Sequence, residues 1–485
     1  MPSDLTHPTS ATTADTRSHL PFDAFATRVL YVVSWALAAI STTQDDFWWL
    51  LRAGQDIWHT GHVPLTDHYS HTAQGRYWSN HEWLWEATAY AFHRVGGMPL
   101  ISAWTGAVAA TTLWLMRRAT RATGYLVPLV LGASMVLLSV SWTHRPQMTS
   151  MLFFALTVLL LIREQYVSIP LVFLVWANLH AQVVIGGLLM GAALMAALVE
   201  ALLNRTGQSL RRARQIVMCT AASAVATLAT PLGPRLWTYV LSANGRPGQD
   251  RIAEWATAFH PLISNALFWA LLTVVVVLAA RRFDRIRPWE ARVPALATLA
   301  MAPMAILAVR NIPFFMVAAA PLLLTLLASR DTPIVGSVER WRAGLATIGA
   351  VAATLVALVW VVQPSKLAWQ PVSNELAAEL RACPGPLYNE YNNGAALIWW
   401  VPQVKVFADN RQDPYPADVI MASAGLDAST YPAVFRQYRI QCAYVPRSDA
   451  LVPALRSDGW TPTYEDSASV VLVPPISPRA TSATE

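Results

Sequence analysis

Residues 183–203 read VVIGGLLMGAALMAALVEALL, an apolar run with a single charged side chain, Glu200. A helix of this length crosses a hydrocarbon core about 30 Å thick, and it satisfies its own backbone hydrogen bonds there. Similar runs lie on both sides of this one, separated by short charged loops. We predict about eleven membrane-spanning helices, near residues 25–41, 98–116, 125–141, 148–162, 168–180, 183–203, 215–232, 261–280, 293–309, 312–329 and 343–362.

The composition agrees with a membrane protein. Of the 485 residues, 54% are hydrophobic and only 13% are charged, and the mean hydropathy is +0.36. A soluble domain has about a quarter of its residues charged. The net charge of +6 lies in the short loops between apolar runs, which argues against a nucleic-acid-binding surface. The predicted fold class is therefore an all-α polytopic membrane bundle.

The charged loops predict the orientation of this bundle. Arginines cluster in loops 117–121, 205–214, 281–292 and 330–342, and these loops fall on one side if the N-terminus is cytoplasmic. Cytoplasmic loops carry the excess of basic residues. The loop 42–97 and the segment 363–485 then lie outside. The alternative, a signal-peptidase site near Ala36-Leu37-Ala38, is less favoured because apolar residues extend the first run towards the N-terminus.

Three regions follow from this topology. Residues 1–24 are expected to be a disordered cytoplasmic N-terminus, residues 25–362 the transmembrane domain, and residues 363–485 a soluble periplasmic domain. In this last domain, strands are predicted at 386–391, 404–408, 442–445 and 470–473, alternating with helices near 373–382, 429–438 and 448–456, which is typical of a small α/β layer. Cys383 and Cys442 either form a disulfide there or remain unpaired.

The first outer loop carries two adjacent carboxylates. Asp45 and Asp46 end the first apolar run, and Trp48 and Trp49 follow at once. A carboxylate at the membrane interface can act as a general base or hold a cation. The alternative is that the pair caps the following helix, whose N-terminal dipole favours anions. One aspartate can cap while the other takes part in chemistry.

A second polar group in the same loop suggests acid/base or metal chemistry. His81, Glu82 and Glu86 lie close together in sequence, but their spacing matches no compact zinc motif. A divalent metal is thus one open interpretation, and no other cofactor is indicated. Most neighbouring histidines are expected to be solvated or to lie at the membrane interface.

Arginines also occur in other outer loops, although basic residues are usually concentrated in cytoplasmic loops. Arg145, Arg251 and Arg310 come from three separate loops predicted to lie outside. A guanidinium binds phosphate oxygens in a bidentate manner, so together these arginines predict an anionic ligand. For each arginine alone, snorkelling to the membrane interface is the simpler explanation.

The first-loop motifs resemble those of bacterial GT-C glycosyltransferase-like membrane proteins, in the superfamily of polyprenyl- or dolichyl-phosphate-sugar mannosyltransferases. The similarity is carried by residues 45–49 (DDFWW), 61–67 (GHVPLTD) and 78–84 (WSNHEWL). It continues at 145–147 (RPQ), 178–180 (NLH), 388–394 (YNEYNNG) and 406–411 (VFADNR), and covers about residues 30–475.

This resemblance implies an enzyme of the bacterial cytoplasmic membrane, a hexosyl- or pentosyltransferase. It would move a sugar from a polyprenyl-phosphate donor to a glycan, lipid or protein acceptor outside the cytoplasm. Asp45 or Asp46 would be the base, and Arg145, Arg251 and Arg310 would bind the donor phosphate. Substrate-binding side chains are expected at Trp48, Trp49, Asp67, Asn80, His81, Glu82, Glu86, His180, Glu254 and Trp255.

Three alternatives remain open from the sequence. They are a flippase or transporter of a similar substrate, a ligase or polymerase of lipid-linked polysaccharide, and a non-catalytic assembly protein of the same fold. Transporters place charged residues and broken helices near the membrane midplane. The apolar runs here are nearly free of charge at their centres, which favours chemistry at one surface.

Overall fold

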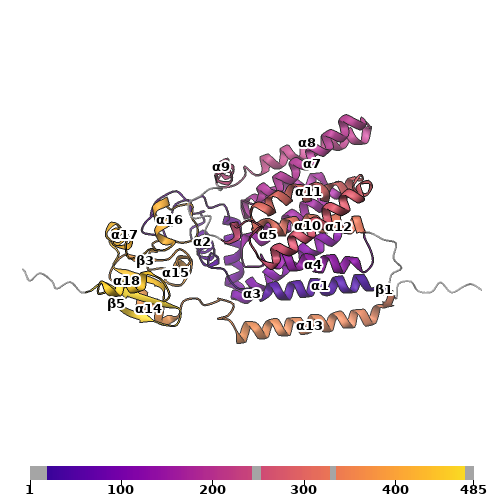
Figure 1. Ribbon diagram of the computed structural model, residues 1–485. Coiled ribbons are helices and arrows are strands. Elements are labelled where there is room, and N and C mark those ends of the chain that lie inside the picture. The colour runs from indigo at the N-terminus through magenta and orange to yellow at the C-terminus, as the bar shows by residue number, and fades with distance from the viewer. Residues whose placement is uncertain (1–18, 243–252, 328–334, 476–485) are drawn as a thin grey trace, which may run out of the picture.

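The computed structural model describes residues 19–242, 253–327 and 335–475. A long bundle of helices carries a small sheet-containing domain at one end, and α2 (Phe47–Thr60) lies between the two parts (Figure 1). The predicted combination of a helical membrane bundle with a small C-terminal α/β domain is confirmed.

Ten of the eleven predicted spans correspond to apolar helices. Seven helices in the described residues are long and apolar enough to cross a membrane: α1 (Phe22–Ala39), α3 (Trp83–Arg118), α7 (Val183–Asn204), α10 (Ile263–Arg281), α11 (Trp289–Leu307), α12 (Ile312–Leu327) and α13 (Val338–Val362). Three apolar helices are shorter: α4 (Leu126–Ser139), α5 (Pro146–Ile162) and α6 (Ile169–Leu179). Helix α1 begins at Phe22, before the expected boundary at residue 25.

The remaining predicted span, 215–232, differs from the structure. Helix α8 (Gly207–Ala226) begins earlier, at a capping box formed by Thr206 and Ser209, and it ends before Pro231. Its first half contains three arginines, at positions 211, 212 and 214. The total of eleven spans therefore stays a prediction.

A glycine divides α3 into two helices. Gly97 has φ +59° and ψ −156°, a backbone conformation that only glycine adopts without strain. The part after Gly97 matches the predicted span at 98–116, whereas the part from Trp83 to Gly96 belongs to the first outer loop. The break lets the chain change direction between the two.

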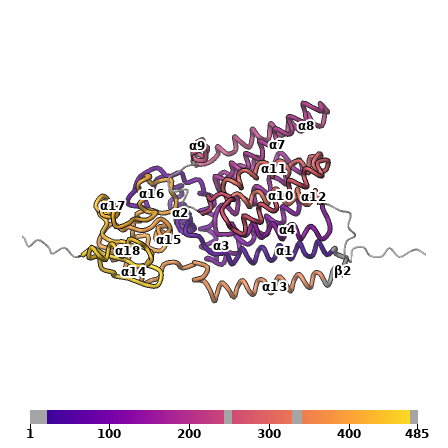
Figure 2. Tube along the Cα trace, viewed as in Figure 1, coloured from indigo at the N-terminus to yellow at the C-terminus, as the bar shows by residue number. Residues whose placement is uncertain are grey.

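Helix α12 lies in the middle of the bundle. It contacts α11, α4, α5 and α10, and nearly all its side chains are buried, among them Phe314 and Phe315. Helix α13 is the opposite case, because it packs mainly along α1 at the edge of the bundle (Figure 2). Its remaining apolar faces are exposed, as expected for a helix surrounded by lipid.

The arginine-rich loops meet at the end of the bundle away from the sheet domain. Arg212 binds Glu200 at 3.0 Å and Glu164 at 2.9 Å, and Arg292 also binds Glu200, at 2.8 Å. An ion pair of 3.5 Å between Arg121 and Glu290 links the loop after α3 to the same group. Three of the four predicted basic loops thus lie on one face. Residues 328–334 of the fourth lie outside the described residues.

The C-terminal domain is built on a four-stranded sheet with the order β3-β4-β6-β5. Its strands are β3 (Leu387–Asn389), β4 (Cys442–Pro446), β5 (Thr461–Glu465) and β6 (Ser469–Val473). β3 and β4 run parallel, and the other two pairs are antiparallel. The surrounding helices are α14 (Asn374–Arg381), α15 (Gly394–Trp400), α16 (Ala417–Ser423), α17 (Tyr431–Tyr438) and α18 (Leu451–Ser457).

One predicted strand is wrong. Residues 404–408 join no sheet, because Val406 bonds instead to the first outer loop, by its amide to Tyr69 and by its carbonyl to His71. Strand β5 was not predicted. Its side chains are mostly exposed, so it lacks the apolar run by which the other strands were recognised.

A disulfide joins Cys383 to Cys442, which resolves the open alternative in favour of pairing. It connects the end of α14 to β4. Cys219 is a free, buried thiol in α8, as expected for packing. Structural disulfides persist in oxidising compartments, so the pair agrees with an extracytoplasmic C-terminal domain.

A buried charged group holds the first outer loop against the C-terminal domain. The Arg411 guanidinium bonds to Asp67 at 2.5 Å and to Asp409 at 2.7 Å, and all three side chains are fully buried. The guanidinium also lies over the rings of Tyr69 and Trp78, at 4.9 and 4.8 Å. The two segments therefore form one packed unit above the bundle.

Candidate functional site

Asp46 stands at the N-terminus of α2 without capping it. Its side chain makes no capping hydrogen bond, and its Oδ2 instead accepts from Nε of Arg145 at 2.7 Å. Its other carboxylate oxygen is buried and has no hydrogen-bond partner among the described residues. Burial raises the pKa of Asp46 to about 6, although the charge of Arg145 opposes the shift. The neighbouring Asp45 is exposed.

Arg145 also belongs to a series of ion pairs that connects several loops. Its NH1 bonds to Glu254 at 3.0 Å, and the other oxygen of Glu254 accepts from Arg310 at 3.1 Å. Burial raises the pKa of Glu254, but the charges of Arg310 and Arg145 outweigh burial, so the pKa is lowered. The Arg310 guanidinium lies 4.6 Å from the ring centre of Trp255. We call Asp46, Arg145, Glu254 and Arg310 the charged cluster.

Backbone contacts hold these groups in place. Arg145 precedes Pro146, which begins α5. Glu254 lies in the short helix η4 (Ala253–Trp255) and Arg310 in η6 (Val309–Asn311), and the amide of Val309 bonds to the carbonyl of Ala256 between the two. The four residues of the charged cluster therefore come from the connections before α2, α5, α10 and α12.

Beside the charged cluster, the Glu82 carboxylate lies close to two imidazole rings. Its Oε1 lies 3.3 Å from Nε2 of His81 and 3.2 Å from Nε2 of His180. Tetrahedral zinc ligands at 2.0–2.1 Å from the metal stand about 3.3–3.4 Å apart, so this spacing suits a divalent cation. The opposite nitrogens face Ser79 and Ser150 at 2.9 and 2.8 Å, as outer partners of metal-bound histidines do. His81, Glu82 and His180 could therefore hold a metal.

We expect the purified protein to bind about one Zn²⁺ per chain, and His180→Ala to weaken the binding by at least tenfold, because one of three ligands is lost. Isothermal titration and elemental analysis after dialysis measure this directly. His62→Ala, which removes an exposed imidazole outside the trio, is the matched control and should bind like the wild type. Equal metal content in the His180 variant would contradict the assignment.

Comparison with known proteins identifies the fold of the chain. No protein-family model and no curated protein matches the chain. Among solved structures, ArnT from Cupriavidus metallidurans bound to undecaprenyl phosphate is similar over 93% of this chain and 97% of that chain, at 13% identity and a TM-score of 0.53. The archaeal oligosaccharyltransferase AglB from Archaeoglobus fulgidus, in complex with an inhibitory peptide and a dolichol-phosphate, matches over 93% and 74%, at 11% identity and a TM-score of 0.51. The chain has the GT-C fold.

Several residues predicted to bind substrate have packing roles within this GT-C fold. Trp48 packs edge-on against Trp400 of α15, and Trp49 packs against Trp78. Both are nearly fully buried. The structure therefore places the tryptophan pair in the hydrophobic core that α2 shares with the C-terminal domain.

The polar residues of the first outer loop divide in the same way. Asp67 pairs with Arg411 in the buried group described above. The Asn80 amide donates to Glu86 at 2.9 Å, and Glu86 is fully buried. Of these polar residues, His81 and Glu82 lie beside the charged cluster, where the charge of Glu82 acts on Asp46 and Arg145. Arg251 lies outside the described residues.

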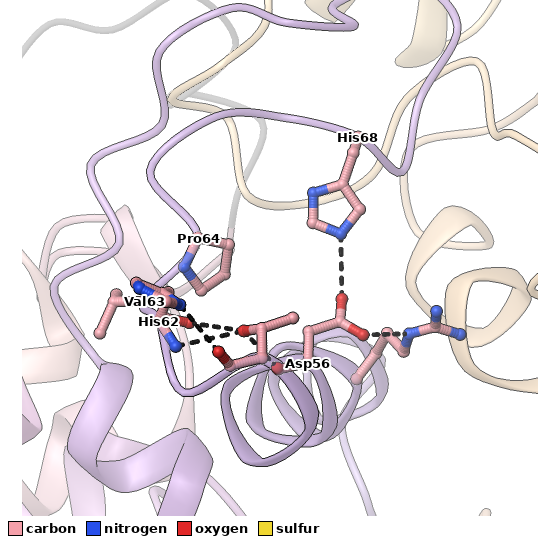
Figure 3. Close-up of a pocket in the computed structure, with 7 residues that line it drawn as sticks. Asp56, His62, Val63, Pro64 and His68 are labelled. Carbon is pink, nitrogen blue, oxygen red and sulfur yellow. Dashed lines mark hydrogen bonds and ion pairs between the residues drawn. The ribbon is translucent and has the colours of Figure 1, made fainter.

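A separate pocket of about 410 Å³ lies at the far end of α2. In Figure 3, the His68 imidazole meets the Asp56 carboxylate, which also accepts from Arg52. The distances are 2.9 and 3.1 Å, and the Tyr69 hydroxyl donates to Asp56 at 2.8 Å. Asp56 follows Asp46 by ten residues, about 15 Å along a helix. None of the predicted site residues lines this pocket.

Sequence reasoning missed the groups that support His180. The indole of Trp176 donates to the Ser150 hydroxyl at 2.8 Å, and that hydroxyl contacts the His180 ring. All are buried between α5 and α6. A serine and a tryptophan within apolar spans read as ordinary core residues, so no local signal could have identified them.

Proposed function

We propose that this protein is a glycosyltransferase that moves a sugar from a polyprenyl-phosphate donor to an acceptor outside the cytoplasm. The observation that carries the proposal is the charged cluster at one end of a GT-C fold, in which the incompletely bonded carboxylate of Asp46 pairs with Arg145, and Glu254 links Arg145 to Arg310. ArnT and AglB, the structures of similar fold, were solved with undecaprenyl phosphate and dolichol-phosphate, which supports a donor of this kind.

Asp46 is the proposed base. The unpartnered oxygen of its carboxylate accepts the proton of the acceptor hydroxyl or amine, and the acceptor then attacks the anomeric carbon of the sugar. The bond from that carbon to the phosphate oxygen breaks as the new bond forms. A carboxylate whose pKa lies near 6 is ionised at neutral pH and is still basic enough to take a proton.

Arg145 and Arg310 bind the leaving phosphate in this proposal. Breaking the glycosidic bond leaves a polyprenyl phosphate with one more negative charge, and guanidinium groups stabilise that charge. Each arginine bonds to Glu254 through one terminal nitrogen, and this shared carboxylate sets the spacing of the two cations. Arg251 remains a third proposed phosphate ligand.

The proposed location is the bacterial cytoplasmic membrane, with the N-terminus inside and the C-terminal domain outside. The arginine-rich loops at the opposite end of the bundle and the disulfide in the C-terminal domain both support this orientation. A lipid-linked sugar would then reach the charged cluster at the outer surface of the membrane.

The proposal is tested by binding and by glycan analysis. Arg145→Gln should weaken the binding of polyprenyl phosphate by at least tenfold, because a cation at the phosphate is replaced by a neutral amide. Arg121→Gln, at the other end of the bundle, is the matched control. A deletion strain should also accumulate one lipid-linked sugar and lack one surface glycan modification. Wild-type lipid binding by the Arg145 variant, with unchanged glycans in the deletion strain, would refute the proposal.

A further inference from the structure

Two turns of the C-terminal domain are joined to each other by side-chain hydrogen bonds. The turn after β3 contains Tyr391, and the second turn spans residues 409–413. The Asn389 amide donates to the carbonyl of Ala408 at 2.7 Å and accepts from the amide of Phe407 at 2.8 Å. The Tyr391 hydroxyl donates to the carbonyl of Asn410 at 3.2 Å. We call these two segments the paired turns.

The paired turns are docked beside the charged cluster. Asp413 accepts from the backbone amide of Ser79, two residues before His81, and Arg411 binds Asp67. Burial raises the pKa of the Tyr391 phenol, a hydrogen bond to Gln412 opposes this shift, and the charges of Asp409, Asp46 and Glu254 add to it, so the phenol lies within the electrostatic reach of the charged cluster. The C-terminal domain therefore faces the charged cluster from the side opposite the membrane bundle.

Among the residues of the paired turns, Asn410 and Tyr391 are neutral and polar, whereas Arg411 and Asp413 are occupied by Asp67 and by the Ser79 amide. Asn410 carries an amide, and its Oδ1 is buried without a hydrogen-bond partner among the described residues. A buried acceptor without a donor costs free energy, so a native structure normally supplies a donor from water or a ligand. Gln412, next but one along the turn, has φ +59°, a strained conformation for a residue with a side chain. Such strain is typical of functional sites.

We propose that Asn410 and Tyr391 recognise the hydroxyl groups of the transferred sugar. This inference rests on the proposed function. It places the phosphate and the sugar of the donor on opposite sides of the site. The arginines on the membrane side hold the phosphate, whereas an uncharged amide and phenol on the opposite side suit neutral sugar hydroxyls. The Asn410 oxygen accepts a hydrogen bond from one sugar hydroxyl, and the phenol oxygen of Tyr391, whose proton goes to the Asn410 carbonyl, accepts from another.

Binding of two lipids separates the two roles. Two ligands are titrated, undecaprenyl phosphate without a sugar and undecaprenyl phosphate that carries one hexose or pentose. The sugar is the one that the wild type prefers. We expect the wild type to prefer the sugar-bearing lipid. Asn410→Ala and Tyr391→Phe should each reduce that preference by about tenfold, equivalent to about 1.4 kcal/mol, and should leave bare-lipid binding unchanged. Asn374→Ala, at an exposed position on α14, is the control and should keep the preference.

The outcomes also separate this inference from the proposed function. A wild-type protein without any sugar preference, or variants that retain it, would overturn the role of the paired turns. Equal weakening of both lipids in the Asn410 and Tyr391 variants would overturn it too, since a general loss of structure is not sugar recognition. Failure of Arg145→Gln to weaken the bare lipid would instead refute the phosphate site.

Discussion

Asp46→Asn is expected to lower the rate of glycan transfer by about 10²–10⁴-fold, the usual contribution of a general base. Asparagine keeps the shape of the side chain but cannot take the acceptor proton. The buried, unpartnered oxygen of Asp46 is the atom that we expect to receive it. Transfer of a labelled sugar from a lipid extract, measured with purified variants in detergent, gives the rate.

Asp45→Asn is the matched control, since it makes the same change one residue earlier at an exposed position. It should lose less than about tenfold in rate. The wild-type rate should also rise with pH and reach half its maximum near pH 6, because the deprotonated base is the active form and burial raises its pKa to about 6. A wild-type rate in Asp46→Asn would exclude this residue as the base.

Arg411→Met is expected to destabilise the protein by about 3–5 kcal/mol, because it leaves the buried carboxylates of Asp67 and Asp409 without their cation. The loss should be largest for the contact between the first outer loop and the C-terminal domain. Thermal unfolding in detergent and limited proteolysis of the loop 61–80 measure the two effects. Both should change together.

Arg447→Met is the control for this prediction. Its pair with Glu465 is largely exposed, and exposed ion pairs contribute about 0–1 kcal/mol. Similar unfolding temperatures for the two variants would mean that the buried group around Arg411 does not hold the domains together. Loss of transfer in Arg411→Met without loss of stability would point instead to a direct role at the charged cluster.

Much of the charged cluster could be predicted from the sequence. Asp46, Arg145, Glu254 and Arg310 were all proposed before their contacts were known, and the structure brings them together. The reason is topological: antiparallel spans return the chain to the same face at every second loop, so polar residues in alternate loops meet there. His81, Glu82 and His180 join them for the same reason.

The tertiary structure shows contacts of other predicted site residues that the sequence did not indicate. Trp48 belongs to the same motif as Asp46 and Asp67 to the next one, yet both contact the C-terminal domain, whereas Trp49 packs against Trp78. Residues 404–408 read as a strand, but they pair with the first outer loop. The partners of Trp48, Asp67 and Val406 each lie more than 300 residues away, and no local pattern records such a contact.

The sequence by itself determined a membrane bundle with its charged chemistry on one face, because span length and the distribution of arginine are properties of short segments. Only the tertiary structure showed that Asp45 and Asp46 have different surroundings. Successive residues at a helix start point about 100° apart, since a turn holds 3.6 residues. Burial of Phe47 and Trp48 sets the rotation of α2, and that rotation turns Asp46 towards Arg145 and leaves Asp45 exposed.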